Sequence, residues 1–185
     1  FNIASMTKPM AALAALQLAE QGKIKIDDPV SVYFPQFANM PVAILDDDGN
    51  LITDKAPAKR QITLRDLMMH TSGLVYGGRG NTAVHKLYPA GSAAAGEAMT
   101  GAEFMDKLGA QPLLHQPGST WDYGFGLDVL GQVIEKVSGK TLGQYFEANI
   151  LKPLGMNDTG FFIPADKAPR YAKALPIDPD TGKPQ

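Results

Sequence analysis

The sequence predicts an α+β fold that is mostly helical, with one small β-hairpin and an incomplete sheet. Residues 6–22 form a long alanine- and leucine-rich segment, and apolar residues recur at helical spacing over 127–137. Residues 42–45 and 51–53 flank the turn sequence Asp46-Asp47-Asp48-Gly49-Asn50, which is typical of a β-hairpin. These segments predict several helices around very little sheet.

The first helices are bounded by recognisable start and stop signals. The helix over 6–22 ends at Gly22, which is a favoured C-cap residue. Asp28-Pro29 is an N-cap followed by a proline, so it predicts a short helix over 30–34 that Pro35 ends.

The second half of the chain carries further capping signals. Thr63 caps an expected helix from 63 to about 70, which a surface excursion over 77–101 follows. Two capping boxes, Thr100-Gly101-Ala102-Glu103 and Thr141-Leu142-Gly143-Gln144, begin helices that extend to about 108 and about 150. Between them the helix over 127–137 is ended by Ser138-Gly139, and a short strand is expected over 160–163. The closing residues 178–185 are typical of a turn.

Composition limits the possible functions. The chain has 185 residues, a formal net charge of -2 and no cysteine. The charge offers no basic surface for nucleic acid, and no apolar run is long enough to span a bilayer. The absence of cysteine excludes disulfides and thiol chemistry but leaves the compartment, cytoplasmic or periplasmic, undecided. The acidic turn over 46–48 lacks the alternating ligands of a calcium loop, so we expect no metal there.

Ser5 and Lys8 are the first candidates for catalysis. They are three residues apart, so on a helix their side chains lie on one face. A serine hydroxyl needs a neighbour that takes its proton, and an amine desolvated by apolar surroundings can do so. Pro9 is tolerated only near a helix start, which predicts that Ser5 lies where free N–H groups favour an oxyanion. The alternative is structural: Ser5 as a helix cap and Lys8 as a solvated residue.

Five segments occur in an order that is typical of one enzyme family. They are Phe1-Asn2-Ile3-Ala4-Ser5-Met6-Thr7-Lys8, Ile26-Asp27-Asp28-Pro29-Val30, Ile62-Thr63-Leu64-Arg65-Asp66-Leu67-Met68-Met69-His70-Thr71-Ser72-Gly73-Leu74, Gln116-Pro117-Gly118 with Trp121-Asp122-Tyr123, and Leu151-Lys152-Pro153-Leu154-Gly155-Met156 with Asp158-Thr159. Together they resemble the serine β-lactamase-like hydrolases, which include class C β-lactamases, D-alanyl-D-alanine carboxypeptidases and family VIII carboxylesterases. The resemblance covers nearly the whole chain.

The resemblance implies a role for each matching residue. Ser5 would be the acyl-accepting nucleophile, Lys8 its partner in proton transfer, and Tyr123 the second general acid or base. The Ser5 backbone N–H would supply half of an oxyanion hole. The family places the other half beside a K-T-G or H-x-G motif, and neither occurs here. Lys140-Thr141-Leu142 looks similar but lacks the glycine, and we interpret it as a helix cap.

The resemblance also implies a β-lactamase/transpeptidase-like fold without cofactors. We expect residues 1–185 to be part of such a domain, lacking N-terminal strands and C-terminal sheet strands that a complete site needs. The family's lactamases carry Y-x-N where this chain has Tyr123-Gly124-Phe125. This difference favours a hydrolase of small carboxylic esters. A β-lactamase or D-alanyl-D-alanine carboxypeptidase, and a non-catalytic relative with a binding or structural role, remain the alternatives.

Other residues have competing interpretations. Trp121 and Phe125 either line the substrate cleft or simply pack. His70, Ser72 and Asp66 could suggest a triad, but no G-x-S-x-G elbow is present, so we predict capping and turn roles for them. The other two histidines, His85 and His115, have no ligand-spaced partners, and we expect no metal or organic cofactor.

Overall fold

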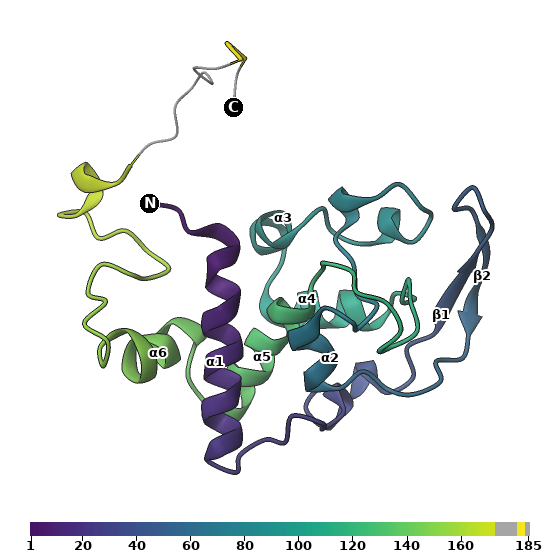
Figure 1. Cartoon of the computed structure of the whole chain (residues 1–185), viewed down its shortest axis with the longest axis horizontal. Coiled ribbons are helices and arrows are strands. Elements are labelled where there is room, and N and C mark those ends of the chain that lie inside the picture. Colours follow the sequence, from purple (N-terminus) through teal and green to yellow (C-terminus); the bar gives the residue numbers. More distant parts are fainter. Residues whose placement is uncertain (173–180, 184–185) are drawn as a thin grey trace.

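A computed structural model describes residues 1–172 and 181–183, and it is predominantly helical (Figure 1). The α-helices are α1 (Thr7–Glu20), α2 (Leu64–Met69), α3 (Ser92–Ala98), α4 (Gly101–Gly109), α5 (Gly126–Ser138) and α6 (Leu142–Phe146). The strands β1 (Val42–Leu45) and β2 (Leu51–Ala56) form a two-stranded antiparallel sheet. No helix in the described ranges is long and apolar enough to cross a bilayer.

Helix α5 is the centre of the core. Its buried residues recur along one face that packs against both α1 and α2. Gly126 makes the close approach to α2 possible, because a Cβ at this position would lie 2.5 Å from the Leu67 carbonyl oxygen. Helix α1 contributes the small residues Ala11, Ala14 and Ala15, all nearly or fully buried, which let its backbone lie close to its neighbours.

The expected threonine caps are confirmed, whereas Asp28 does not cap the 3-10 turn over Val30–Val32, whose N-cap residue is Pro29. The Thr63 and Thr100 side chains accept from the Asp66 and Glu103 backbone N–H groups, and each acidic side chain accepts from the cap backbone in return. The Thr141 cap of α6 is built in the same way, with Gln144 as its partner. Helix α5 ends at Gly139 in the left-handed region, as the sequence predicts. Beyond α6 the chain continues as a π-helical turn over Glu147–Leu151.

The predicted hairpin is also present. Leu45 pairs with Leu51, and the turn between them is stabilised by Asp46, whose Oδ1 accepts from the backbone N–H groups of Asp48 and Asn50 at 3.0 and 2.8 Å. This Asx-type turn explains why an acidic residue opens the loop without a metal ion being required.

The helical segment expected over 30–34 ends before Pro35, as predicted: its 3-10 turn spans Val30–Val32, Phe34 is extended, and Pro35 begins a separate 3-10 turn over Pro35–Phe37. Two further sequence-based expectations were wrong. Residues 77–101 are not a simple surface excursion, because they contain α3 and bury Val84 and Tyr88, and Gly77 packs against the Tyr88 carbonyl. Residues 160–163 form bends and not a strand. The turn expected over 178–185 lies largely outside the described residues.

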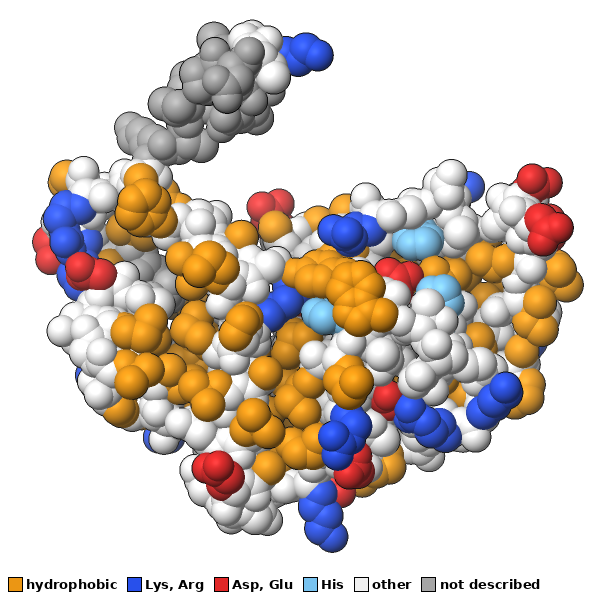
Figure 2. All heavy atoms as spheres, in the orientation of Figure 1, with side chains coloured by type: hydrophobic (Ala, Val, Ile, Leu, Met, Phe, Trp, Pro, Cys, Tyr) orange, Lys and Arg blue, Asp and Glu red, His pale blue; other side chains and the backbone are white. Residues whose placement is uncertain are grey.

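One side of α1 is left uncovered by the described part of the chain. Leu13 and Leu16 on α1 are 42% and 46% exposed although this helix is apolar nearly all round. Figure 2 shows hydrophobic side chains gathered over the region where α1 and α6 lie in Figure 1.

Candidate active site

Ser5 lies at the entrance to α1, as predicted. It occupies a 3-10 turn over Ala4–Met6 that runs directly into the helix, and its side chain is exposed. Ala4 before it has a φ of 43°, which is unusual for a residue with a side chain, and the Asn2 Oδ1 atom accepts from the Ala4 backbone N–H at 2.9 Å. A tight, locally strained turn before a helix is a frequent setting for a reactive side chain.

Tyr123 contacts Ser5 although it lies 118 residues later in the sequence. Its hydroxyl donates to Ser5 Oγ at 2.5 Å. Two backbone contacts hold its loop: the Asp122 N–H donates to the His70 carbonyl at 2.8 Å, and Gly124 lies so close to Leu74 that a Cβ would be 2.1 Å from its carbonyl oxygen. The tyrosine is therefore positioned by the turn that follows α2.

Lys8 lies beside the same phenol. Its Nζ atom is 5.0 Å from the centre of the Tyr123 ring and 5.6 Å from that of Tyr76, so both aromatic faces stabilise its positive charge. Burial alone would lower the pKa of Lys8, but hydrogen bonding with Tyr123 and Tyr76 and the negative charge of Asp128 outweigh it, and the pKa is raised. The pKa of Lys8 thus shifts in the direction opposite to the one that desolvation alone would give.

The charge of Lys8 acts on Tyr123. Burial tends to raise the pKa of the Tyr123 phenol, yet the hydrogen bonds with Ser5 and Lys8 and the nearby positive charge lower it overall. Arg79 adds a second cation, with its guanidinium carbon 5.1 Å from the centre of the Tyr123 ring. A phenol with a lowered pKa ionises more readily, and as a phenolate in contact with a serine hydroxyl it is suited to take the hydroxyl proton.

The remaining predicted residues divide into a rim and a packed layer. Trp121 is 65% exposed and lies edge-on to His70, with the ring centres 6.0 Å apart, at the rim of the site. Phe125 is fully buried and packs edge-to-face against Tyr76 and Phe104. Phe125 therefore has a packing role beneath the site in this structure, and it does not line the cleft beside Ser5.

His70 has a structural position next to the reactive group. Its ring stacks on Tyr123 with the centres 4.6 Å apart, and its backbone adopts the left-handed conformation that ends α2. Burial and the Lys8 charge lower the pKa of His70, so the ring is neutral and does not compete with Lys8 as a cation. His70 does not form a triad with Ser72 and Asp66, because Asp66 instead binds Arg60 and caps α2.

Tyr76 and Asp128 are site residues that sequence reasoning missed. Tyr76 follows the Thr71-Ser72-Gly73-Leu74 turn, and Asp128 resembles an ordinary acidic residue in a first helical turn. Both line the cleft beside Ser5 and Lys8, and the Tyr76 hydroxyl donates to Asp128 Oδ2 at 3.0 Å. Their spacing in the sequence, 52 residues, carries no signal that could have paired them.

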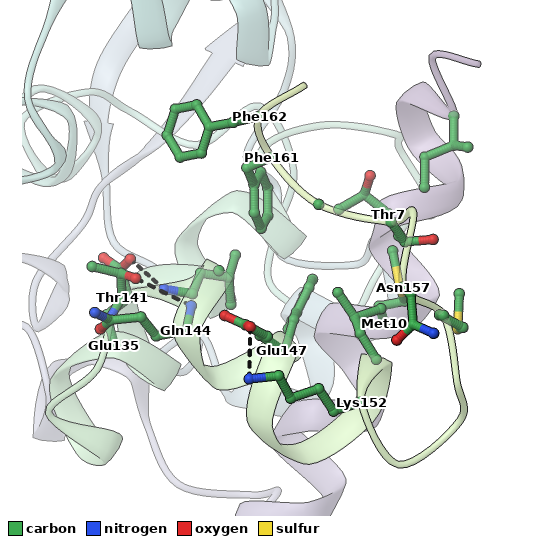
Figure 3. Close-up of a pocket in the computed structure, with 18 residues that line it drawn as sticks. Thr7, Met10, Glu135, Thr141, Gln144, Glu147, Lys152, Asn157, Phe161 and Phe162 are labelled. Atoms are coloured by element: carbon green, nitrogen blue, oxygen red, sulfur yellow. Dashed lines mark hydrogen bonds and ion pairs between the residues drawn. The ribbon is translucent and has the colours of Figure 1, made fainter. Parts of the chain in front are cut away.

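Two hollows meet at Thr7, directly after the 3-10 turn that holds Ser5. A cleft of about 700 Å³ runs from Ser5 and Lys8 toward α3 and the start of α5. A second, mostly apolar groove of about 870 Å³ lies between α1, α6 and residues 156–162 (Figure 3). Thr7 and Phe161 line both hollows, and Figure 3 shows the Phe161 ring beside the groove, with the Glu147–Lys152 ion pair at 2.9 Å along its edge. No cluster of potential metal ligands occurs within residues 1–172 and 181–183.

Comparisons with known proteins identify relatives of this chain. Residues 1–184 match a family model described as Beta-lactamase. Esterase EstB of Burkholderia gladioli is 34% identical over 162 residues, which is 87% of this chain and 38% of EstB. The structure of EstCE1, described as a hydrolase with promiscuous acyltransferase activity, is 30% identical with a TM-score of 0.75, over 98% of this chain and 43% of that one.

A third relative is a β-lactamase and carboxypeptidase by name. The structure of a beta-lactamase/D-alanine carboxypeptidase from Yersinia pestis is 25% identical with a TM-score of 0.69, over 95% of this chain and 44% of that protein. The described residues thus have a β-lactamase/transpeptidase-like fold, with the mostly helical composition and single hairpin that the sequence predicts. The chain spans less than half the length of each of these three relatives.

Proposed function

Since this chain belongs to the beta-lactamase family, we propose that it carries the catalytic residues of a serine hydrolase that cleaves small carboxylic esters through an acyl-enzyme. The observation that carries the proposal is the contact between the Tyr123 hydroxyl and Ser5 Oγ at 2.5 Å, with Lys8 beside the Tyr123 ring. The names of EstB and EstCE1 support an esterase or hydrolase.

The geometry supports a two-step reaction. Ionised Tyr123 takes the Ser5 proton, Ser5 Oγ forms a bond to the ester carbonyl carbon, and the carbonyl π electrons move onto oxygen. When the intermediate collapses, the bond to the leaving alkoxide breaks and Tyr123 returns the proton to that oxygen. Water then repeats the sequence on the acyl-Ser5 ester and releases the carboxylic acid. Lys8 keeps its proton throughout and stabilises the tyrosinate, and no step uses a metal or organic cofactor.

The negatively charged oxygen of the intermediate needs hydrogen-bond donors beside Ser5. The Ser5 backbone N–H lies in the turn at the positive end of α1 and is suited to donate to the developing oxyanion. We propose that a second donor comes from polypeptide beyond these 185 residues, and that the chain is one part of a larger domain. The relatives' greater length supports this proposal, as do the exposed Leu13 and Leu16 and the apolar groove of Figure 3, which sheet strands would cover.

The residue two places after Tyr123 favours esters over β-lactams. The buried Phe125 ring leaves no side-chain amide at this position to hold a substrate carbonyl. The alternative is a β-lactamase or D-alanyl-D-alanine carboxypeptidase that uses the same Ser5, Lys8 and Tyr123, and the Yersinia pestis structure supports it as a relative. A non-catalytic relative is the second alternative.

A fluorophosphonate probe tests whether Ser5 is activated. We expect a covalent adduct on Ser5 by mass spectrometry and none in the Ser5→Ala variant. Turnover of a nitrophenyl acyl ester and of a chromogenic cephalosporin is then compared on the polypeptide that contains the whole domain. Faster ester cleavage supports the esterase, faster cephalosporin cleavage supports the lactamase, and absence of both the adduct and turnover leaves the non-catalytic alternative.

A further inference from the structure

Tyr76 and Asp128 form a hydrogen-bonded pair that lines the cleft beside Lys8. Tyr76 is only 7% exposed, and its hydroxyl donates to Asp128 Oδ2 at 3.0 Å and lies 2.7 Å from Ser92 Oγ. The Lys8 ammonium lies 5.6 Å from the centre of the Tyr76 ring. Three separate elements, the loop after α2, the start of α3 and the first turn of α5, thus meet at the Tyr76 hydroxyl, and the ring of Tyr76 faces Lys8 on α1.

Asp128 lies in the first turn of α5, but its contacts show that it does not cap this helix. An acidic residue in a first helical turn usually interacts with the free backbone N–H groups there. The N-terminus of α5 has no side-chain cap hydrogen bond, and Asp128 Oδ2 accepts from Tyr76 instead. The carboxylate is therefore directed at the cleft and not at its own helix end.

The protonation state of the Tyr76 phenol follows from its surroundings. Burial and the Asp128 charge raise the pKa of Tyr76, so its phenol stays protonated and remains a donor. The same carboxylate is one of the groups that raise the pKa of Lys8. A neutral phenol and a carboxylate beside an ammonium stabilise the charged amine more than either group does alone.

We propose that Tyr76 and Asp128 are positioning residues that hold the Lys8 ammonium against the Tyr123 ring, so that Tyr123 and not Lys8 takes the Ser5 proton. The inference rests on the proposed function and assigns the division of roles within it. In the step concerned, the Ser5 O–H bond breaks, a phenol O–H bond forms on Tyr123, and all Lys8 N–H bonds persist. Tyr76 and Asp128 exchange no proton with the substrate.

Other charged or titratable groups near Lys8 are few in the part of the chain that the structure describes. Tyr123 faces Lys8 from the loop before α5, and His70 faces it from the end of α2 as a neutral ring. Arg79 lies over the Tyr123 ring, and Asp122 acts on His70 from the same loop as Tyr123. Asp128 is the carboxylate among the groups that act on Lys8, so its neutralisation is the sharpest test.

The first test measures Lys8 directly and does not require catalysis. Lysines are labelled by reductive ¹³C-methylation, the Lys8 signal is assigned with Lys8→Arg, and its pKa is followed by NMR titration. We expect the pKa to fall by about one pH unit in Asp128→Asn and by less in Tyr76→Phe. Asp106→Asn on α4 and Tyr88→Phe in the aromatic layer carry the same chemical changes away from Lys8, and they should leave it unchanged. An unaltered Lys8 pKa in both Tyr76→Phe and Asp128→Asn overturns the proposal.

A second readout separates this inference from the proposed function. If the polypeptide that contains the whole domain forms no fluorophosphonate adduct on Ser5, the proposed function fails, while the titration still decides the role of the pair. If the adduct forms, we expect labelling to slow about tenfold in Tyr76→Phe and in Asp128→Asn, and Asp128→Glu to recover part of the rate. Thermal melts identify any variant that fails to fold. If either Tyr76→Phe or Asp128→Asn fails to fold, the labelling rate of the remaining one tests the proposal. If Tyr76→Phe and Asp128→Asn both fold and both label at the native rate, the proposal is contradicted.

Discussion

The Tyr123 hydroxyl lies 2.5 Å from Ser5 Oγ although 118 residues separate the two in the chain. The contact depends on the turn after α2, where the His70 carbonyl accepts from the Asp122 N–H and Leu74 packs closely against Gly124. Ser5 is held by the entrance of α1, and α1 and α2 both pack on α5. The core therefore fixes both partners of the contact independently of any substrate.

Removing the Tyr123 hydroxyl should slow acylation strongly while leaving the fold intact. We expect Tyr123→Phe to reduce the rate of fluorophosphonate labelling of Ser5 about 100-fold, because Ser5 loses its proton acceptor. The measurement is the labelling rate by mass spectrometry. Tyr145→Phe, the same change in α6, should label at the native rate. Native labelling of Tyr123→Phe would show that another group activates Ser5.

The pH dependence of labelling should follow Tyr123. Because the pKa of this phenol is lowered, the rate should rise with pH and reach half its maximum below the usual value of about 10. Lys8→Met removes the cation that favours tyrosinate, so the midpoint should move to higher pH, whereas Lys8→Arg keeps the charge and should shift it less. The midpoint is obtained from labelling rates across a pH series. A midpoint that Lys8→Met leaves in place would contradict the assigned role of Lys8.

Local signals in the sequence predicted the helices and their ends well. The Thr63, Thr100 and Thr141 caps depend on residues three positions apart, so the information lies within one turn. The position of Ser5 follows in the same way from the motif before α1 and from Pro9. The resemblance added Tyr123, which no local pattern could have joined to Ser5.

Properties that depend on tertiary contacts could not be predicted. Burial lowers the pKa of Lys8, but Tyr123, Tyr76 and Asp128, which belong to different elements, raise it more, so burial considered alone gives the wrong direction. The burial of Phe125 likewise requires the aromatic neighbours that the segment 77–101 and α4 supply. That segment looked like a loop because its glycines, such as Gly77, serve close backbone packing.

The backbone contact beneath Tyr123 gives a further prediction. In Gly124→Ala the new methyl group would lie 2.1 Å from the Leu74 carbonyl oxygen, so the loop must move away and take Tyr123 with it. We expect labelling of Ser5 to slow about 100-fold, because small displacements of a catalytic group have effects of this size. Gly96→Ala is the matched control, since a Cβ there meets no atom within 4 Å. Native labelling of Gly124→Ala would show that the loop adapts without moving Tyr123.

Asp66 should make the main ionic contribution to the stability of the α2 region. Its carboxylate accepts from both Arg60 Nη atoms and caps α2 through Thr63, and the residue is 4% exposed. Burial alone would raise the pKa of Asp66, but these hydrogen bonds lower it overall. We expect Asp66→Asn to lower the free energy of unfolding by about 2 kcal/mol, less than for a fully buried pair because the Arg60 side chain is 45% exposed.

The sign of the pH effect distinguishes this contribution from simple packing. A carboxyl group whose pKa is lowered by folding stabilises the protein above its unfolded value of about 4, and the stabilisation is lost as the pH falls through the folded value. Urea unfolding of the native chain and of Asp66→Asn should therefore begin to converge at about pH 4, and the difference should vanish only below the lowered pKa of Asp66. Asp27→Asn is the matched control, because Asp27 also forms a two-point pair with an arginine, Arg65, but both side chains are exposed. It should leave the unfolding midpoint nearly unchanged, and an equal loss in both variants would refute the special role of Asp66.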